Sequence, residues 1–485
     1  MRILLVDPPG KNKGLNTGLA YLSAALQQHH EVKTLDLNNI ESGLCGEANP
    51  EMSPDEVEKR VVTEIHNFEP QLVGVSVKTF TAEISKHIFA LIHKHQPEVM
   101  TAAGGPHITL DGHSFLERNQ IDFGIQGEGE YTFLALCDAV ERKESIENIE
   151  GIFYKNNGQP FHNPRTNTIR DLDSLPLPNY DSFTSVTSNG GILPEYPILT
   201  SRGCPYKCSY CSMPKIMGGK WRSHTPARVI EELSQAKQRY KSKSFTVVDD
   251  NFTLSLKRVD TICDLLVSKK VNLPWSSQNG IRADRINPSL AEKMKLSGCT
   301  YVWIGVETAD EYVFKKLHKG EELQKIGEGI NHLRAAGIRV GGFFIVGLPG
   351  STREADLKSI VFVKNFKIDG WWFNFVPYPH TEAWNWVQTH GHILRPIDGV
   401  VQYGANDIEP VFETAEYSKQ SRIDTYNEIH VKLKYFDRLA DPSLKQLKKW
   451  PLVYKKVRPH GLLSVFLLLT FIAKYNVRQF LNRFR

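Results

Sequence analysis

The chain lacks long hydrophobic runs and a disulfide framework. Its most apolar segment, 462–473, has twelve residues, fewer than the 18 or so that a membrane-spanning helix needs. The seven cysteines are an odd number, and four of them stand alone in the sequence. Only the four residues 3–6 form an apolar run before Asp7, too few for a signal-peptide core. We therefore expect a folded protein of the reducing cytoplasm.

Acidic residues are missing from segment 442–485, which holds ten Lys or Arg and no Asp or Glu. The whole chain has a net charge of +5 from 59 basic and 54 acidic residues, so the body carries 49 minus 54, or −5. This basic excess predicts a local anionic partner and argues against nucleic acid binding by the body. A helix at 462–473 can lie on an anionic membrane surface, with the protein peripheral at its inner face, or dock on the preceding domain. Both alternatives stay open.

The composition, 41% hydrophobic and 23% charged, is globular, and 485 residues suffice for two to four domains. Up to residue 140, apolar runs alternate with helix-length segments; the runs are 3–6, 31–37, 72–77, 99–103 and 121–125. This alternation predicts an α/β domain at 1–145, a doubly wound, Rossmann-like parallel sheet. The Pro- and Asp-rich segment 171–178 breaks both periodicities, so we place a linker at 146–190.

Six more apolar runs alternate with helical segments between 191 and 410. They are 196–200, 245–248, 274–277, 301–306, 340–346 and 371–375. Six βα units predict a partial (β/α)6 TIM-like barrel, followed by a helical C-terminal region at 411–485. Because ligands of parallel α/β folds bind beyond the carboxyl ends of strands, site residues are expected in the loops that follow them.

Three cysteines fall within eight residues after the first barrel strand, as Cys204, Cys208 and Cys211 in the spacing C-x-x-x-C-x-x-C. A structural zinc site closes four ligands, and no second C-x-x-C pair or histidine at ligand spacing accompanies them. Three thiolates suit a 4Fe-4S cluster with one open iron. The spacing, with Tyr210 just before the last cysteine, resembles the radical S-adenosylmethionine (SAM) superfamily.

This resemblance implies that the three cysteines hold the cluster, that SAM chelates the open iron, and that reduction releases a 5'-deoxyadenosyl radical. It also implies SAM-binding roles at later strand ends. The implied residues are Tyr210 beside the cluster, Asp249, Asp250 and Asn251 at the amino group, Arg282 at the carboxylate, Glu307 at the ribose and Gly347 near the adenine. A helix cap is an equal alternative for the Asp-Asp-Asn triplet, and a structural salt bridge is one for Arg282 or Glu307.

No G-x-G-x-x-G follows the first strand, which disfavours a dinucleotide in the N-terminal domain. Its glycine-rich strand-end loops instead resemble the cobalamin-binding domain of cobalamin-dependent radical SAM enzymes. The resemblance implies a corrin held by Thr17, Gly18, Ser76, Gly104, Gly105, Pro106, His107, Gly127, Glu128 and Gly129. The nearest match to D-x-H-x-x-G contains His113 but lacks the glycine and follows the fourth strand. We therefore expect His113 at the surface and cobalamin bound without a histidine ligand.

Together the resemblances cover about residues 1–390. They imply an enzyme that methylates an unactivated carbon of a small-molecule or lipid-like substrate, with a flavodoxin or ferredoxin as electron donor. The closest alternative is radical oxidative cyclisation or ring rearrangement, as in anaerobic porphyrin cyclases. Methylthiotransfer is disfavoured because Cys45 and Cys137 are too few for a second cluster. The non-enzymatic alternative is a corrinoid sensor or a zinc-stabilised membrane adaptor.

Overall fold

The computed structural model describes residues 1–10, 13–39, 52–156, 158–166, 168–397 and 408–432. Residues Met1–Arg422 form one compact unit, and a second begins at Ile423. Cys45 and the basic segment 442–485, with its predicted interfacial helix, lie outside the described residues. Within the described ranges, no helix combines the length and the apolarity required to cross a membrane.

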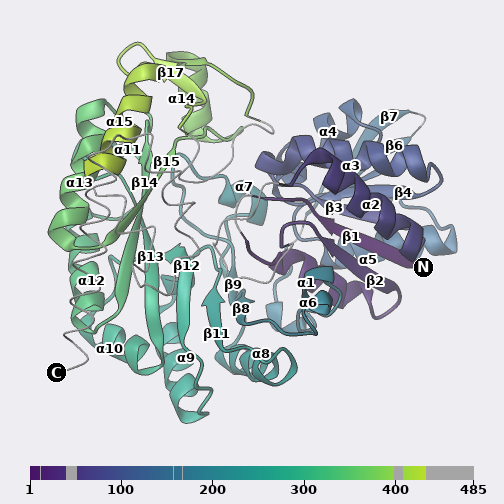
Figure 1. The fold of residues 1–485 in the computed structure, drawn as a ribbon, viewed down its shortest axis with the longest axis horizontal. Helices are drawn as coiled ribbons and strands as arrows, with labels where there is room; N and C mark the ends of the chain where they lie inside the picture. Colours follow the sequence, from purple (N-terminus) through teal and green to yellow (C-terminus); the bar gives the residue numbers. More distant parts are fainter. Residues whose placement is uncertain (11–12, 40–51, 157, 167, 398–407, 433–485) are drawn as a thin grey trace. The chain divides into compact units, whose positions relative to one another are not determined.

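The N-terminal sheet has the strand order β2-β1-β3-β4-β5-β6-β7 (Figure 1). Its strands are β1 (Arg2–Asp7), β2 (Glu31–Asp36), β3 (Leu72–Ser76), β4 (Met100–Gly104), β5 (Phe123–Ile125), β6 (Ile152–Asn156) and β7 (Gln159–Asn163). The first five run parallel, and they are the five that the sequence predicts. Their order, 2-1-3-4-5, is that of flavodoxin-like doubly wound folds, in which the ligand site lies beside β1 and β3.

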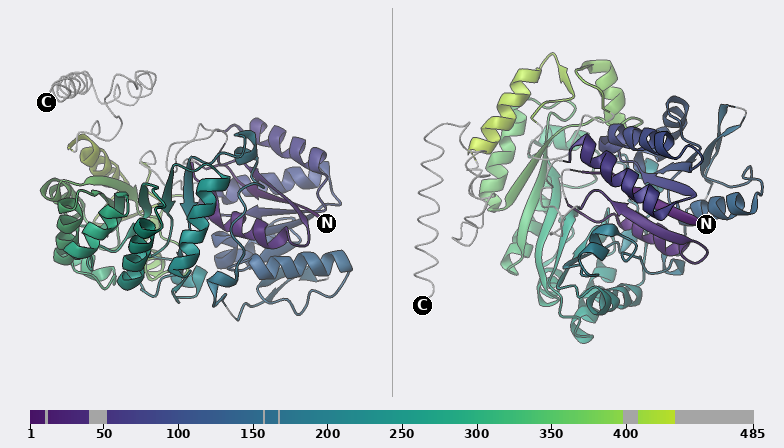
Figure 2. Two further views of the ribbon diagram at one scale, coloured as in Figure 1. Left: turned by 90° about the horizontal axis from the view of Figure 1, so that it is seen from below. Right: turned by 45° about the vertical axis from the view of Figure 1, so that its right-hand side comes forward.

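Helices cover both faces of this sheet (Figure 1, Figure 2). They are α1 (Thr17–Leu26), α2 (Pro54–Phe68), α3 (Ala82–His95), α4 (Pro106–Arg118) and α5 (Glu130–Arg142), with a 3-10 turn η1 (Thr79–Thr81) before α3. Val61 of α2, Ile88 of α3 and Leu116 of α4 join one buried cluster with Val6 and Val75 of the strands. Helices α1 and α5 pack against each other. Parallel strands buried on both sides explain the continuous apolar runs in the sequence.

The predicted boundary at residue 145 falls inside this sheet, because β6 and β7 extend it with antiparallel pairs. The rest of the predicted linker is also packed against the N-terminal domain. The backbone N–H of Thr34 donates to the carbonyl of Ser182 at 2.8 Å, and that of Asn179 to Ala20 at 3.0 Å. This part contains η2 (Leu172–Ser174) and α6 (Thr184–Ser188). Segment 146–190 is thus structured by contacts with distant residues, which local composition does not reveal.

The second sheet confirms the six predicted barrel strands, all parallel, in the order β15-β14-β13-β12-β11-β8. They are β8 (Glu195–Ile198), β11 (Ser244–Val247), β12 (Trp275–Ile281), β13 (Cys299–Glu307), β14 (Arg339–Val346) and β15 (Asp369–Asn374). The intervening helices are α7 (Met213–Met217), α8 (Pro226–Arg239), α9 (Leu256–Ser268), α10 (Pro288–Leu296), α11 (Glu311–Lys316), α12 (Leu323–Ala335) and α13 (Arg353–Phe366), with η3 (Phe252–Leu254) before α9. Strands β8 and β15 are opposite edges, so the barrel is partial.

Two short antiparallel pairs were not expected from the sequence. Strands β9 (Ser201–Arg202) and β10 (Arg222–Ser223) pair at the two ends of the segment that contains the three clustered cysteines. After α14 (Glu382–His390), β16 (Gly391–Ile393) pairs with β17 (Phe412–Thr414), followed by α15 (Lys419–Lys432). The region predicted to be helical from residue 411 therefore starts with strand β17 and continues with helix α15. Phe412 of this strand pairs with β16 and is completely buried.

Candidate functional site

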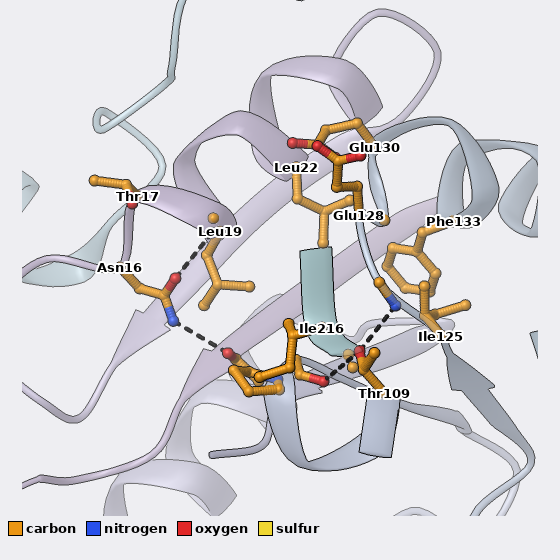
Figure 3. A pocket seen from close by; sticks show the side chains of 18 of the residues that line it. Asn16, Thr17, Leu19, Leu22, Thr109, Ile125, Glu128, Glu130, Phe133 and Ile216 are labelled. Atoms are coloured by element: carbon orange, nitrogen blue, oxygen red, sulfur yellow. Dashed lines mark hydrogen bonds between the residues drawn. The ribbon is translucent and has the colours of Figure 1, made fainter. Parts of the chain in front are cut away.

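A cavity of about 320 Å³ lies at the carboxyl ends of the N-terminal strands (Figure 3). Nine of the ten residues predicted to hold a corrin line it: Thr17, Gly18, Ser76, Gly104, Gly105, Pro106, Gly127, Glu128 and Gly129. Aliphatic side chains such as Leu19, Leu22 and Ile125 complete this wall. A rim of glycines over an aliphatic floor lets the backbone approach a large flat ligand, so these residues fit a corrin.

His107 is the exception among these ten residues. It is 8% exposed, and its ring packs edge-on against Phe115 with 5.3 Å between the ring centroids. It does not belong to the cavity lining, because its position on α4 turns the ring toward the packed side of the helix. His113 is exposed, as predicted. Among the described residues, no histidine side chain lines the cavity.

Hydrogen bonds hold the cavity wall in place without a ligand. The side-chain oxygen of Asn16 accepts from the N–H of Leu19 at 3.1 Å and caps α1, while its amide nitrogen donates to Asp7 at 2.9 Å and Ser76 at 3.1 Å. On the other side, the hydroxyl of Thr109 accepts from the N–H of Gly127 at 2.8 Å (Figure 3). These bonds tie the loop after β1 to the end of β3, and tie α4 to the loop after β5, which makes both sides of the wall preorganised for binding.

Gly105 gives a prediction for cobalamin binding. Its φ is +96°, and a Cβ there would lie 2.8 Å from the carbonyl oxygen of Val77. Gly105→Ala is expected to displace the cavity rim and to weaken cobalamin binding by about tenfold or more, as about 1.4 kcal/mol of strain would do. Equilibrium dialysis measures the affinity. The matched control is Gly158→Ala, with a φ of +78° but nothing within 4 Å of the new Cβ. Equal affinities in both variants would contradict this assignment.

The barrel closes the cavity from the other side. Its contributions are Leu199, Arg202, Ile216, Met217, Val248 and Asp250. Leu199 and Val248 directly follow β8 and β11, while Arg202 and Ile216 flank the cysteine motif on both sides in the sequence. The predicted corrin wall and residues on both sides of the cysteine motif therefore line one shared cavity within the compact unit.

The cysteine loop lies between β9 and α7 and is anchored on several sides. The backbone N–H of Ser209 donates to Leu317 at 2.9 Å, and its carbonyl accepts from Ala383 at 2.9 Å. The phenol of the partly buried Tyr210 donates to Glu307 at 2.9 Å, and the amide of Asn251 lies 3.7 Å from the sulfur of Cys204. Burial raises the pKa of Cys208 to about 11 and that of Cys211 to about 12. Without a bound metal these thiols are protonated at neutral pH, and a metal centre would have to displace the protons.

The number of thiols bears on the choice between zinc and a cluster. A structural zinc site closes four ligands, whereas the motif supplies three cysteines. Three thiolates suit a 4Fe-4S cluster with one open iron.

The three residues of the Asp249-Asp-Asn251 triplet after β11 have different environments. Asp249 is 1% exposed and does not line the cavity. Its carboxylate accepts from the hydroxyls of Thr200 and Ser201 at 2.6 and 2.5 Å, so it positions the start of the cysteine loop. Asp250 lines the cavity, and burial raises its pKa to about 6. The side-chain oxygen of Asn251 is buried without a hydrogen-bond partner among the described residues. That acceptor fits the predicted ammonium of SAM.

Arg282 and Glu307 were expected to contact SAM directly. The guanidinium of Arg282 is bound by Asp284 at 3.1 Å and Glu321 at 2.9 Å and stacks 3.8 Å from the Tyr206 ring, so the geometry is that of the alternative, a structural ion pair at the rim. Glu307 has a φ of +68°, an unusual conformation for a side chain with a Cβ. Its carboxylate accepts from Tyr210 and lies 3.4 Å from the ammonium of Lys319. It thus links β13 to the cysteine motif.

Gly347, expected near the adenine of SAM, ends β14 with a φ of +82°. Its N–H donates to Asp356 at 2.9 Å and its carbonyl accepts from Arg422 at 3.1 Å. A Cβ there would lie 2.1 Å from the Arg422 guanidinium, so only glycine fits.

Lys319 was not among the predicted site residues. Burial lowers the pKa of its ammonium, but the ion pairs with Glu307 and Glu321 outweigh burial and raise the pKa above its usual value. The only signal for Lys319 in the sequence is its position in the loop after α11.

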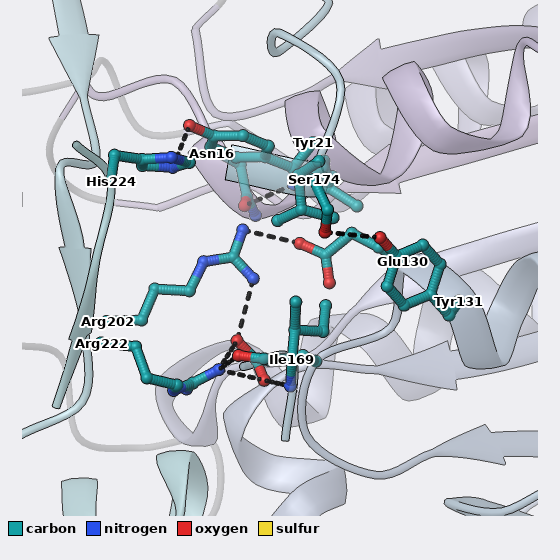
Figure 4. Close-up of polar contacts among 12 residues, drawn as sticks. Asn16, Tyr21, Glu130, Tyr131, Ile169, Ser174, Arg202, Arg222 and His224 are labelled. Carbon is teal, nitrogen blue, oxygen red and sulfur yellow. Dashed lines mark hydrogen bonds and ion pairs between the residues drawn. The ribbon is translucent and has the colours of Figure 1, made fainter. Parts of the chain in front are cut away.

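A buried ion-pair network joins the cavity wall to the cysteine loop (Figure 4). Arg202, two residues before Cys204, pairs with Glu128 at 3.0 Å and Glu130 at 2.7 Å. Arg222 and Arg165 also reach Glu128, each at 2.8 Å. Burial raises the pKa of Glu128, but the three arginines outweigh it and hold the pKa below its usual range. Sequence reasoning singled out Glu128 but missed these three arginines.

Beside this network, Tyr21 of α1 contacts three barrel residues. Arg202 lies 4.9 Å from its ring, and its hydroxyl contacts His224 at 3.2 Å and donates to Glu232 of α8 at 3.3 Å. Burial lowers the pKa of His224 to about 4 and raises that of Glu232 to about 7. The neutral imidazole, and a carboxyl that is only partly ionised near pH 7, lower the cost of burying these groups.

Comparison with known sequences agrees with this geometry. A B12 binding domain matches residues 10–137, and the Radical SAM superfamily matches residues 198–362. An uncharacterized methyltransferase of Pyrococcus horikoshii is 32% identical, over 81% of this chain and 84% of that protein. Cytidylyl-2-hydroxyethylphosphonate methyltransferase of Streptomyces wedmorensis is 26% identical, over 68% of each. Anaerobic magnesium-protoporphyrin IX monomethyl ester cyclase of Rubrivivax gelatinosus is 23% identical, over 68% of this chain and 60% of that protein.

Two solved structures show the same fold. The cobalamin-dependent SAM radical enzyme OxsB, with aqua-cobalamin and SAM bound, has a TM-score of 0.69 at 16% identity, covering 98% of this chain and 75% of that one. The radical SAM methyltransferase TsrM of Kitasatospora setae, with cobalamin and a [4Fe-4S] cluster bound, has a TM-score of 0.64 at 18% identity, covering 79% and 76%.

The two matched domains and this shared fold define a radical SAM enzyme with an N-terminal cobalamin domain. The chain belongs to the cobalamin-dependent radical SAM methyltransferase family, which also has cyclases among its relatives. The predicted fold class and the predicted cofactors, a 4Fe-4S cluster, SAM and cobalamin, are confirmed.

Proposed function

We propose that this enzyme transfers a methyl group to an unactivated carbon of an apolar small molecule, at the mouth of the cavity shared by the two domains. One observation carries the proposal: the predicted corrin residues and the residues that flank the cysteine motif line the same cavity. Transfer between two cofactors requires the reacting centres to be held close together in a fixed orientation. The ion pairs of Arg202 provide a rigid connection of this kind.

In this proposal, Cys204, Cys208 and Cys211 ligate the cluster, and the free oxygen of Asn251 accepts a hydrogen bond from the amino group of SAM. When bound, the cofactors supply a hydrogen-abstracting radical and a transferable methyl group. The chain holds the motif in place through Ser209 and Tyr210. The aliphatic cavity wall excludes water from the reacting centres. The absence of histidine among the described lining residues supports cobalamin bound without such a ligand.

Two further parts of the proposal rest on the sequence. A flavodoxin or ferredoxin is the proposed electron donor, because the cluster must be reduced before SAM is cleaved. The ten basic residues of 442–485 support an anionic membrane surface as a partner.

Anaerobic reconstitution of the full-length protein tests the proposal. After addition of iron, sulfide and hydroxocobalamin, we expect one 4Fe-4S cluster and one corrinoid per chain, measured by iron analysis and absorbance. Reduction in the presence of SAM should then release 5'-deoxyadenosine, measured by chromatography. Stoichiometric zinc without deoxyadenosine would instead identify the non-enzymatic adaptor. Deoxyadenosine formation without corrinoid binding would refute methyl transfer through cobalamin.

A further inference from the structure

Side chains on β13, β14 and β15 alternate between two faces of the barrel sheet. One set is fully buried and packs on α13: Phe344 lies 6.0 Å from the ring of Phe362, and the indole N–H of Trp372 donates to Ser359 at 2.9 Å. The other set points away from this helix and stays partly exposed. It consists of Trp303, Phe343, Trp371 and Phe373, which we call the aromatic wall.

The four rings of the aromatic wall form one continuous surface. Trp303 stacks on Phe343 with 4.7 Å between centroids and meets Trp371 edge-on at 6.1 Å, while Phe373 lies 5.8 Å from Phe343. The indole N–H of Trp371 is buried and has no hydrogen-bond partner among the described residues. The surface that the rings expose is thus apolar.

Glycines on the same face make room for the ring of a neighbouring strand. Gly341 pairs with Trp303 and Gly305 pairs with Phe343 in the strand register. A Cβ on Gly341 would lie 2.5 Å from the Trp303 ring, so the indole lies across β14 where a side chain would otherwise project. The inside of a (β/α) barrel is normally filled by layers of large side chains. Here glycines replace some of these side chains, and the remaining rings stay accessible to solvent.

The aromatic wall is continuous with the cysteine motif. A Cβ on Gly305 would lie 2.5 Å from the carboxylate of Glu307, so this carboxylate lies on the face that carries the wall, and it bonds to Tyr210. Charges near the wall are paired: Glu307 with Lys319 at one end, and Asp369 with Arg339 at the other. A molecule bound at the motif would therefore meet rings rather than free charges.

Building on the proposed function, we infer that the aromatic wall binds the hydrocarbon body of the substrate, which is an apolar lipid. A strongly charged substrate would lose its hydration without gaining an ion pair on this face, which disfavours binding. Hydrocarbon placed against the rings gains from the removal of apolar surface from water.

Equilibrium dialysis of the reconstituted full-length enzyme with farnesol, a fifteen-carbon isoprenoid alcohol, tests the inference, with sucrose as the polar comparison. Phe343→Glu places a charge in the wall and should weaken farnesol binding at least tenfold. Phe343→Leu keeps the surface apolar and should stay within twofold of the unmodified enzyme. Val361→Glu is the matched control, with the same change of charge on the exposed outer side of α13.

Farnesol bound no better than sucrose, or bound equally by Phe343→Glu, would overturn the inference. Circular dichroism and iron content check the fold of each variant, and Phe373→Glu replaces Phe343→Glu if the latter does not fold. Deoxyadenosine formation separates the two proposals. Its presence without farnesol binding would refute the aromatic wall alone, whereas farnesol binding without a cluster would refute the proposed function alone.

Discussion

Replacing Cys208 with alanine is expected to abolish the iron-sulfur cluster and all deoxyadenosine formation. With three protein ligands for four irons, the loss of one thiolate leaves two irons without a protein ligand. Iron content after anaerobic reconstitution should fall from about four per chain to below one, and the brown absorbance should disappear. Because Cys208 lies in a loop and is partly exposed, the change should cost little folding stability.

Cys263→Ala is the matched control for this experiment. Cys263 is 1% exposed inside α9, where burial raises the pKa of its thiol to about 11. Its loss leaves a small cavity in the core but should leave the cluster and deoxyadenosine formation intact. Full iron content in Cys208→Ala, or loss of the cluster in Cys263→Ala, would refute the assignment of the motif.

Removal of Arg202 is expected to produce the second large effect, this time on stability. Arg202 is the one cation within ion-pair distance of Glu130 among the described residues, and both side chains are 4% exposed. Arg202→Met leaves Glu130 as a buried carboxylate without a partner. Breaking a buried pair in this way typically lowers the free energy of unfolding by about 3–5 kcal/mol. Urea unfolding of the cofactor-free chain measures the change.

A double-mutant cycle separates the ion pair from other effects of the Arg202 change. Adding Glu130→Gln to Arg202→Met removes the orphaned charge and should recover part of the lost stability. The exposed pair between Arg239 and Asp181 is the control, and Arg239→Met should cost about 1 kcal/mol or less. If Arg202→Met lost no more stability than the control Arg239→Met, the network would not stabilise the folded chain. If the double variant recovered no stability, the loss in Arg202→Met would not come from the unpaired charge of Glu130.

The sequence-based assignment succeeded for elements that neighbouring residues specify. Strands such as β3 and β14 appear as short apolar runs because each is buried on both faces or packed against a helix, and burial of adjacent residues can be read directly from their order. The cysteine motif is equally local, since its ligands must come from one loop. Nine of the ten residues predicted to hold a corrin line one cavity for the same reason: they follow strand ends, which meet at one edge of a parallel sheet.

The misses share one physical cause, the dependence of a residue's role on partners far away in the chain. Strands β6 and β7 are polar edge strands whose place depends on pairing with β5. The roles of Asp249 and Arg282 were decided by Thr200 and Glu321, about 40 to 50 residues away. His107 lies one residue from the cavity-lining Pro106, but the rotation of α4 directs its ring to Phe115.

The sequence by itself therefore determined the α/β architecture, the cysteine motif and the strand-end loops of this protein, because periodic burial and cysteine spacing are properties of consecutive residues. Only the tertiary structure decided that the two domains share one cavity, that Arg202 joins Glu130 to the cysteine loop, and that four rings line one face of the barrel. Such contacts join residues separated by tens of positions. Their geometry arises from strand order, register and helix rotation, which no short stretch of sequence specifies.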